Sequence, residues 1–209
     1  MKAIIFDLDG VIVSTDHYHY LAWKQMADKE NIYFDETIND RLRGISRMAS
    51  LEIILEKAQK TYTDEEKIAL ATYKNDIYKD LLKDIYVTHI LPGVMDVLHT
   101  LKQKNYKIAI GSSSKNAKFI LKRIALFKYF DAISDGTDIK HSKPAPDVFL
   151  IAAKKLNIDP KDCIVVEDAL SGIEAAHNAG MKSFAVGDAI NSTLATYKSK
   201  NILDLLKYV

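Results

Sequence analysis

The sequence predicts an α/β protein: a doubly wound, mainly parallel sheet of Rossmann-like type that carries an inserted helical cap domain. Three observations lead to this fold class. Four short apolar runs, at 3–6, 107–111, 163–167 and 183–187, are typical of strands buried on both faces. Helical patterns alternate with the last three runs, as they do in doubly wound sheets. Residues from about 15 to 83 contain almost no strand signal, so they interrupt this alternation as one helical block.

The inserted block has helical periodicity throughout. Its patterns cover residues 17–31, 46–60 and 63–84. We therefore assign residues 1–14 and 88–209 to an α/β catalytic core domain and residues 15–87 to a helical cap domain. The two connecting segments, near 13–16 and 84–91, are candidates for a hinge.

Proline and glycine mark helix boundaries in the rest of the core. Its helical patterns are expected at 93–105, after Pro92-Gly93, at 116–130, at 145–157 and at 169–180, where Gly180 ends the last one. The segment 130–136 is expected to add a short strand. The tail 201–209 predicts a closing helix, with a late edge strand missing or reduced.

Composition narrows the functional class. The chain has 29 basic and 28 acidic residues, a net charge of +1 and 48% hydrophobic residues, which predict a packed protein with no broad nucleic-acid or membrane affinity. Cys163 stands alone, so no internal disulfide can form, and no Cys/His cluster has zinc spacing. No apolar stretch approaches the length of a membrane span, and Asp7 interrupts the apolar N-terminal run. We expect a cytoplasmic monomer.

Carboxylates follow two of the predicted strands. Asp7 and Asp9 lie two residues apart after the first strand, so on an extended chain they face the same side. Glu167 and Asp168 end the run at 163–167. Ligands of open α/β sheets bind at the carboxyl ends of the strands. Four acids gathered there suit a hard cation with oxygen ligands, best Mg²⁺, which often accompanies phosphate.

Groups that bind anions follow another strand. Ser112, Ser113 and Ser114 come after the run at 107–111 and before a helix, where hydroxyl and free N–H groups bind phosphate. Lys143, held extended by Pro144, can neutralise phosphoryl oxygens. This combination is typical of phosphoryl transfer. The structural alternative, ordinary turns and a helix N-cap, does not explain why all the polar clusters fall at one sheet edge.

Four ordered motifs, FDLDG, IGSSS, SKPAPD and VVEDALSG, resemble the haloacid dehalogenase-like hydrolase superfamily over almost the whole chain. The resemblance implies that Asp7 is the nucleophile that becomes an aspartyl phosphate, and that Asp9 is the general acid/base, with its backbone carbonyl on Mg²⁺. It implies a Mg²⁺ site made by Asp7, Asp9, Glu167 and Asp168, and a transferring-phosphate site made by Ser112 and Lys143. An aspartate at the second position points to phosphatases and mutases. Gly111 and Ser113 stand where alanine is expected.

The inserted block carries candidate substrate residues. His19 and Trp23 share a helix face, and Arg47 falls in a first turn after the N-cap candidate Ser46, where it opposes the helix dipole. A guanidinium there suits bidentate phosphate binding. The simpler alternatives are a core position for Trp23 and a solvated lysine for Lys74.

Together, the elements YH…AW, GxSR, KND and SxSKN resemble the β-phosphoglucomutase branch of the superfamily. That resemblance implies a cytoplasmic isomerase with a β-glucose 1,6-bisphosphate intermediate and a second, distal phosphate site. The implied substrate residues are Thr15, His19, Trp23, Gly44, Arg47, Ser50, Lys74, Ser114, Lys115 and Asn116.

Two other functions stay open at this point. A sugar-phosphate phosphatase of the same superfamily would use the same Asp7 and Asp9 but needs only the proximal phosphate site. A non-catalytic sugar-phosphate sensor would keep the fold, although the intact set of acids argues against it. In every case the expected partners are small-molecule sugar phosphates.

Overall fold

The apolar runs form the strands of a single sheet in the computed structural model, which describes residues 2–209. Neighbouring strands pair in parallel throughout, in the order β3-β2-β1-β4-β5-β6. The chain order reverses at β1, which lies between β2 and β4, and ligands of doubly wound sheets bind at such a reversal. The strands are β1 (Ala3–Phe6), β2 (Lys107–Gly111), β3 (Ala132–Ser134), β4 (Cys163–Glu167), β5 (Lys182–Ala185) and β6 (Tyr197–Lys198).

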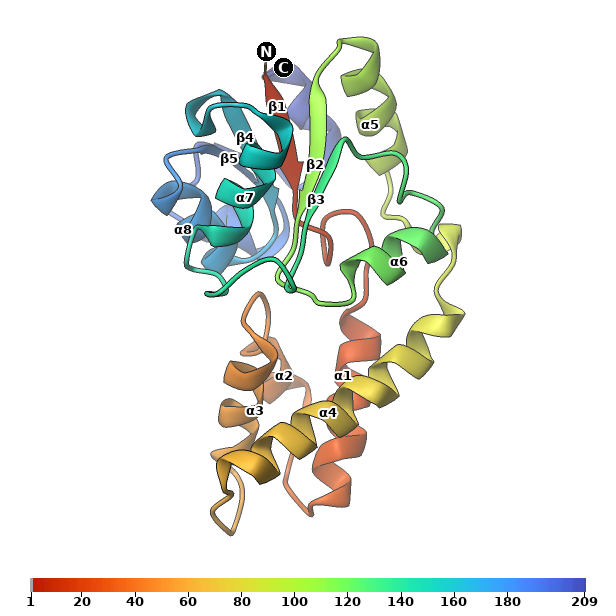
Figure 1. The fold of residues 1–209 in the computed structure, drawn as a ribbon, viewed down its shortest axis with the longest axis vertical. Helices are drawn as coiled ribbons and strands as arrows, with labels where there is room; N and C mark the ends of the chain where they lie inside the picture. The colour runs from red at the N-terminus through yellow and green to blue at the C-terminus, as the bar shows by residue number, and fades with distance from the viewer. Residues whose placement is uncertain (1) are drawn as a thin grey trace. The chain divides into compact units, whose positions relative to one another are not determined.

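Helices cover both faces of this sheet, as the doubly wound prediction requires. In Figure 1, α7 (Asp147–Leu156) and α8 (Leu170–Asn178) lie on one side of the strands and α5 (Val94–Gln103) lies on the other. The α7–α8 side buries a continuous apolar cluster that includes Ile5, Phe149 and Val165. Cys163 belongs to the same cluster, where its thiol is buried.

Two core elements differ from their predicted extent. Helix α6 (Ala117–Arg123) ends well before residue 130, because Ala125 adopts a left-handed φ of 60° that a helix cannot continue through. The late edge strand is present but reduced: β6 has two residues. The tail after it forms a 3₁₀ helix (Ile202–Lys207), and Tyr208 stacks on Tyr197 with ring centroids 4.0 Å apart.

The inserted block is a separate helical unit. The chain divides into Thr15–Ile85 and an α/β unit made of Tyr86–Val209 and the residues up to Ser14. This division lies two residues from the predicted boundary at 87. Its helices are α1 (Asp16–Lys29), α2 (Glu36–Asp40), α3 (Arg47–Leu55) and α4 (Asp64–Leu81). In residues 2–209, no helix is long and apolar enough to cross a membrane.

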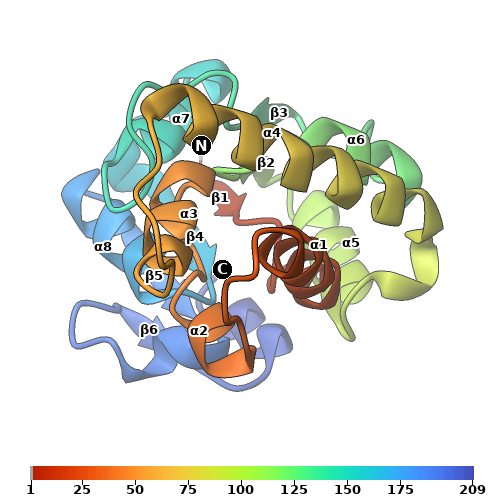
Figure 2. The same ribbon diagram turned by 90° about the horizontal axis from the view of Figure 1, so that it is seen from below.

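Local signals and one apolar core build the helical unit. Ser46 caps α3 through Ala49 N, as predicted, and Thr63 forms a reciprocal capping box with Glu66 at the start of α4. The 18-residue α4 packs on α1 and α3 (Figure 2). Helix α2 was not predicted, because its five residues are too few to show a period.

Candidate active site

The two strands at the centre of the sheet bring their terminal carboxylates together. Phe6 of β1 pairs with Val166 of β4, and the next amide, Asp7 N, donates to Val166 O at 2.9 Å. Asp7 and Glu167 therefore leave the sheet side by side. They are 6% and 1% exposed, so both carboxylates are held out of water, where a charge is costly unless it is compensated.

Lys143 provides part of that compensation. Its Nζ lies 2.5 Å from Asp7 Oδ1 and also contacts Glu167 Oε1, and the whole residue is only 5% exposed. Burial alone would lower the pKa of this ammonium, but the two carboxylates outweigh burial and raise its pKa above the ordinary value. The lysine is therefore a fixed cation, as its predicted role beside a phosphoryl group requires.

One lysine does not neutralise the site. Burial raises the pKa of Asp7 from 3.8 to about 7; Lys143 opposes this shift, and the negative charges of Glu167 and Asp9 add to it. A buried group of one cation and several carboxylates favours uptake of a positive charge, either a proton or a metal ion. The arrangement is electrostatically suited to a divalent cation.

Asp168 reaches the same edge through Gly10. This glycine has φ of +80°, and a Cβ built on it would lie 2.0 Å from Asp168 Oδ2. Any side chain at position 10 would displace the carboxylate. The loop that carries Asp9 thus packs directly under Asp168, and Gly10 N closes that loop on Val13 O at 2.8 Å. Asp9 itself is partly exposed.

The residues fit the Mg²⁺ that the motifs imply. Among residues 2–209, no three His, Cys, Asp or Glu side chains are arranged to hold a metal ion. Mg²⁺ needs only one or two carboxylates when phosphate and water complete its shell. Both oxygens of Glu167 are engaged, by Lys143 and by Ala169 N at 2.9 Å, which suits contact with the ion through water. Asp7 and Asp168 could supply carboxylate oxygens to such an ion directly.

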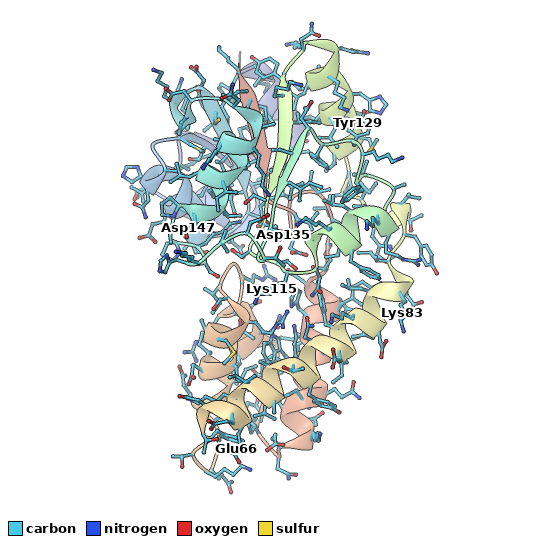
Figure 3. All side chains as sticks on the ribbon, in the orientation of Figure 1. Glu66, Lys83, Lys115, Tyr129, Asp135 and Asp147 are labelled. Carbon is cyan, nitrogen blue, oxygen red and sulfur yellow. The ribbon has the colours of Figure 1, made fainter. Side chains whose placement is uncertain are left out.

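The predicted phosphate-binding residues after β2 form a tight loop, which we call the anion loop (Ser112–Asn116). Ser114 N donates to Ser112 Oγ, and Asn116 N donates to Ser114 Oγ, each at 3.2 Å. Ser112 and Asn116 are buried, whereas Lys115 is exposed. Figure 3 labels Lys115 near Asp135, which follows the neighbouring strand β3.

The helical unit gathers a second set of predicted residues. Lys74 is 2% exposed, so the alternative of a solvated lysine is wrong. Its Nζ lies 2.9 Å from His19 Nδ1 and 4.6 Å from the ring centroid of Trp23. Burial, reinforced by the charges of Lys74 and Arg47, holds the pKa of His19 well below 6.5. The imidazole is therefore neutral and accepts the hydrogen bond from the lysine.

Trp23 serves the core of the helical unit as well. It is buried in the apolar cluster with Met26 and Leu51, so the simpler core position proposed for it is confirmed. Arg47 begins α3 and is partly buried, and Ser50 is buried one turn later. Gly44 is exposed with φ of 73° in the turn before α3.

Thr15 is fully buried at the start of α1, where its carbonyl accepts from His19 N at 3.0 Å.

The sequence did not predict two residues that lie against the predicted ones. Tyr78 is buried, with its ring 4.1 Å from that of His19 and 4.6 Å from Lys74 Nζ. Its position one turn after Lys74 was a usable signal.

Gly172 is the other missed residue. A Cβ at this position in α8 would lie 1.9 Å from the Glu167 carboxyl carbon. No local pattern distinguishes this glycine from an ordinary helix interruption, because its role depends on a contact between two elements.

A model of the haloacid dehalogenase-like hydrolase family matches residues 1–180. β-Phosphoglucomutase of Bacillus subtilis is 49% identical over 90% of this chain and 83% of its own length. A phosphorylated carbohydrates phosphatase of Thermotoga maritima is 30% identical over the full length of both. The crystal structure of a β-phosphoglucomutase from Clostridium difficile superimposes with a TM-score of 0.92 at 41% identity, over 100% of this chain and 95% of that one.

Proposed function

The chain belongs to the haloacid dehalogenase-like hydrolase family, and from this membership we propose that it is a Mg²⁺-dependent phosphomutase that interconverts β-D-glucose 1-phosphate and glucose 6-phosphate. The observation that carries this proposal is the identity of 49% to a β-phosphoglucomutase, compared with 30% to the phosphatase described above. The geometry of both units supports it.

The α/β unit supplies the transfer chemistry. A carboxylate oxygen of Asp7 attacks phosphorus and forms an aspartyl phosphate while the bond to the leaving sugar oxygen breaks. Asp9 gives its proton to that oxygen. In the reverse direction a sugar hydroxyl attacks the aspartyl phosphate, and Asp9 takes the hydroxyl proton. Lys143, fixed beside Asp7, balances the charge on the phosphoryl oxygens, and Ser112 donates to one of them.

Mg²⁺, held by Asp7, Asp168 and the Asp9 carbonyl, with Glu167 acting through water, would offset the negative charge of the carboxylate and phosphoryl group as they approach. The raised pKa of Asp7 supports this assignment, because a site that attracts a proton at neutral pH also attracts a cation.

A mutase must also recognise the phosphate that is not transferred. We assign this task to Arg47 of the helical unit and to Ser114, Lys115 and Asn116 of the anion loop. The buried Lys74–His19 pair supports a polar substrate. Burying an ammonium group costs free energy, so a lysine this fully removed from water indicates a functional role. Thr15, Trp23, Gly44 and Ser50 complete the proposed set.

The turnover then needs a bisphosphate. The phosphoenzyme passes its phosphate to either monophosphate and forms β-glucose 1,6-bisphosphate, which returns the other phosphate to Asp7. A sugar hydroxyl outcompetes water when it is held in position, because orientation contributes more than intrinsic reactivity. The second candidate, a sugar-phosphate phosphatase, is favoured by the phosphatase relatives and differs in letting water attack the aspartyl phosphate.

Product analysis separates the two functions. Purified protein is given β-glucose 1-phosphate, Mg²⁺ and a trace of bisphosphate, and glucose 6-phosphate and free phosphate are measured in parallel. The mutase predicts glucose 6-phosphate with little free phosphate. Stoichiometric release of phosphate without glucose 6-phosphate would reject the mutase in favour of the phosphatase.

A pair of variants tests the distal assignment. Arg47→Ala should lower mutase kcat/KM by about 100-fold, the loss expected for a charged hydrogen bond of about 2–3 kcal/mol. Arg41→Ala is the matched control, since Arg41 is an exposed arginine of the same unit that pairs with Glu56. Equal turnover of the two variants would show that Arg47 does not hold the second phosphate.

A further inference from the structure

The anion loop takes two of its backbone hydrogen bonds from the end of the neighbouring strand. Ser112 N donates to Ser134 O, the last residue of β3, at 3.1 Å. Gly136 N donates to Ser114 O at 3.2 Å. The first bond holds the start of the loop and the second holds its middle, so the segment after β3 acts on the part of the loop that contains Ser114 and Lys115.

Gly136 makes the closest approach between these segments. A Cβ built on it would lie 2.3 Å from Ser113 O and 2.9 Å from Lys115 N. Its φ lies outside the left-handed region, so a side chain would not strain its own backbone. The position needs glycine for space: the anion loop occupies the volume that a methyl group would take.

Gly136 belongs to a segment that we call the β3 turn (Asp135–Asp138). Hydrogen bonds within this turn fix its conformation. Asp135 is 1% exposed, and its Oδ1 accepts from Thr137 N at 2.9 Å and from Thr137 Oγ1 at 2.5 Å. Its amide donates to Asp138 Oδ2 at 3.0 Å.

Both flanking helices anchor this turn. Lys118 of α6 lies 3.0 Å from Asp135 Oδ2. Lys155 of α7 donates to Asp138 Oδ2 at 2.8 Å and to Ile133 O at 2.7 Å. Because the β3 turn is anchored at both ends, a methyl group added at Gly136 would displace the anion loop and not the turn.

We propose that the β3 turn is a positioning element for the anion loop, and that Gly136 sets the placement of Ser114 and Lys115. This inference rests on the proposed function, because that function assigns these two residues to the phosphate that is not transferred. To reach even 3.0 Å, the shortest separation that a real Cβ tolerates, Ser113 O must move by at least about 0.7 Å in Gly136→Ala. Ser112 has its own bond to Ser134 O, so the residues around Asp7 keep their places.

The test compares two phosphoryl donors. Mutase kcat/KM reports both phosphate sites, whereas phosphoenzyme formation from acetyl phosphate, which has no second phosphate, reports only the site around Asp7. Because a misplacement near 1 Å costs about 100-fold, Gly136→Ala should lower mutase kcat/KM by about 30- to 100-fold. Its rate with acetyl phosphate should stay within threefold of wild type.

Two further variants keep this test decisive. Gly180→Ala is the control for lost stability, since its φ of +70° strains an alanine while no atom lies within 4 Å of the added Cβ; it should leave both rates unchanged. Thr137→Val removes the Oγ1 bond to Asp135 at an exposed position. It should lower mutase kcat/KM by about threefold to tenfold with no change in the acetyl phosphate rate, and it replaces Gly136→Ala if that variant does not fold.

A parallel loss with both donors, or wild-type mutase kinetics in Gly136→Ala, would overturn the positioning role. A different result would reject the proposed function: wild-type protein would release phosphate from sugar phosphates without forming the isomer. In that event the positioning role falls together with the proposed function, because a phosphatase needs only the proximal site. If wild-type protein forms the isomer, the ratio of kcat/KM for the sugar phosphate to that for acetyl phosphate measures the effect of Gly136 on the anion loop alone. An unchanged ratio in the variants rejects the inference.

Discussion

Removing the ammonium of Lys143 should destabilise the protein strongly, and Lys143→Met does so with little change in volume. The lysine is 5% exposed and contacts both Asp7 and Glu167. Deleting one partner of a buried charge pair leaves the other uncompensated and costs about 3–5 kcal/mol. Here two carboxylates are left, but Asp7 can take up a proton because its pKa is already about 7. We therefore expect Lys143→Met to lower the free energy of unfolding by about 3 kcal/mol at pH 7, the lower end of this range.

The loss should depend on pH. Asp7 holds its proton more tightly in the folded chain than in the unfolded chain, so between pH 4 and 7 the folded state binds more protons and the free energy of unfolding falls as pH rises. Without Lys143 the pKa of Asp7 rises further. The variant should approach wild type near pH 4.5 and diverge from it toward pH 8.

Urea unfolding, followed by circular dichroism without Mg²⁺, measures both effects. Lys107→Met is the matched control: this exposed lysine pairs with Asp131 at 2.8 Å, and surface pairs contribute at most about 1 kcal/mol. Asp7→Asn combined with Lys143→Met should lose less than Lys143→Met alone, because one buried charge is gone. Equal stability of the Lys143 and Lys107 variants at pH 7 would refute the view that a buried ion pair holds this site together.

Four smaller predictions follow from the same structure. Mg²⁺ at 100 times its Kd should raise the free energy of unfolding by about 2.7 kcal/mol, and EDTA should reverse this; a midpoint that ignores Mg²⁺ argues against a metal site. Gly172→Ala should weaken Mg²⁺ binding about tenfold or more, because its Cβ would strike the Glu167 carboxyl group, and calorimetric titration measures this. Burial raises the pKa of the Cys163 thiol to about 11, so iodoacetamide at pH 8 should react at least 100-fold more slowly with the folded than with the urea-unfolded chain. Thr63→Ala should lower the free energy of unfolding by about 1 kcal/mol in urea titrations, since it breaks the capping box with Glu66.

Sequence patterns predicted the parts of this protein that depend on neighbours along the chain. Buried strands appear as apolar runs and helices as a 3.6-residue period, so β1, β2 and β4 were assigned to the residue. The polar residues that follow each strand identified Asp7 and Glu167, because parallel strands end at a common edge. The short helix α2 is not predicted, since about one and a half turns are too few to show a helical period.

Only the tertiary structure decided which of these residues touch. Lys143 lies 136 positions from Asp7 in the chain, and its contact with Glu167 as well as Asp7 makes it a buried cation between two acids. Lys74 has the local pattern of a solvated lysine and is buried against an aromatic ring. The need for glycine at position 136 comes from the packing of one loop on another. Chain periodicity records the environment of a single element, whereas burial, pKa and steric fit arise between elements distant in sequence.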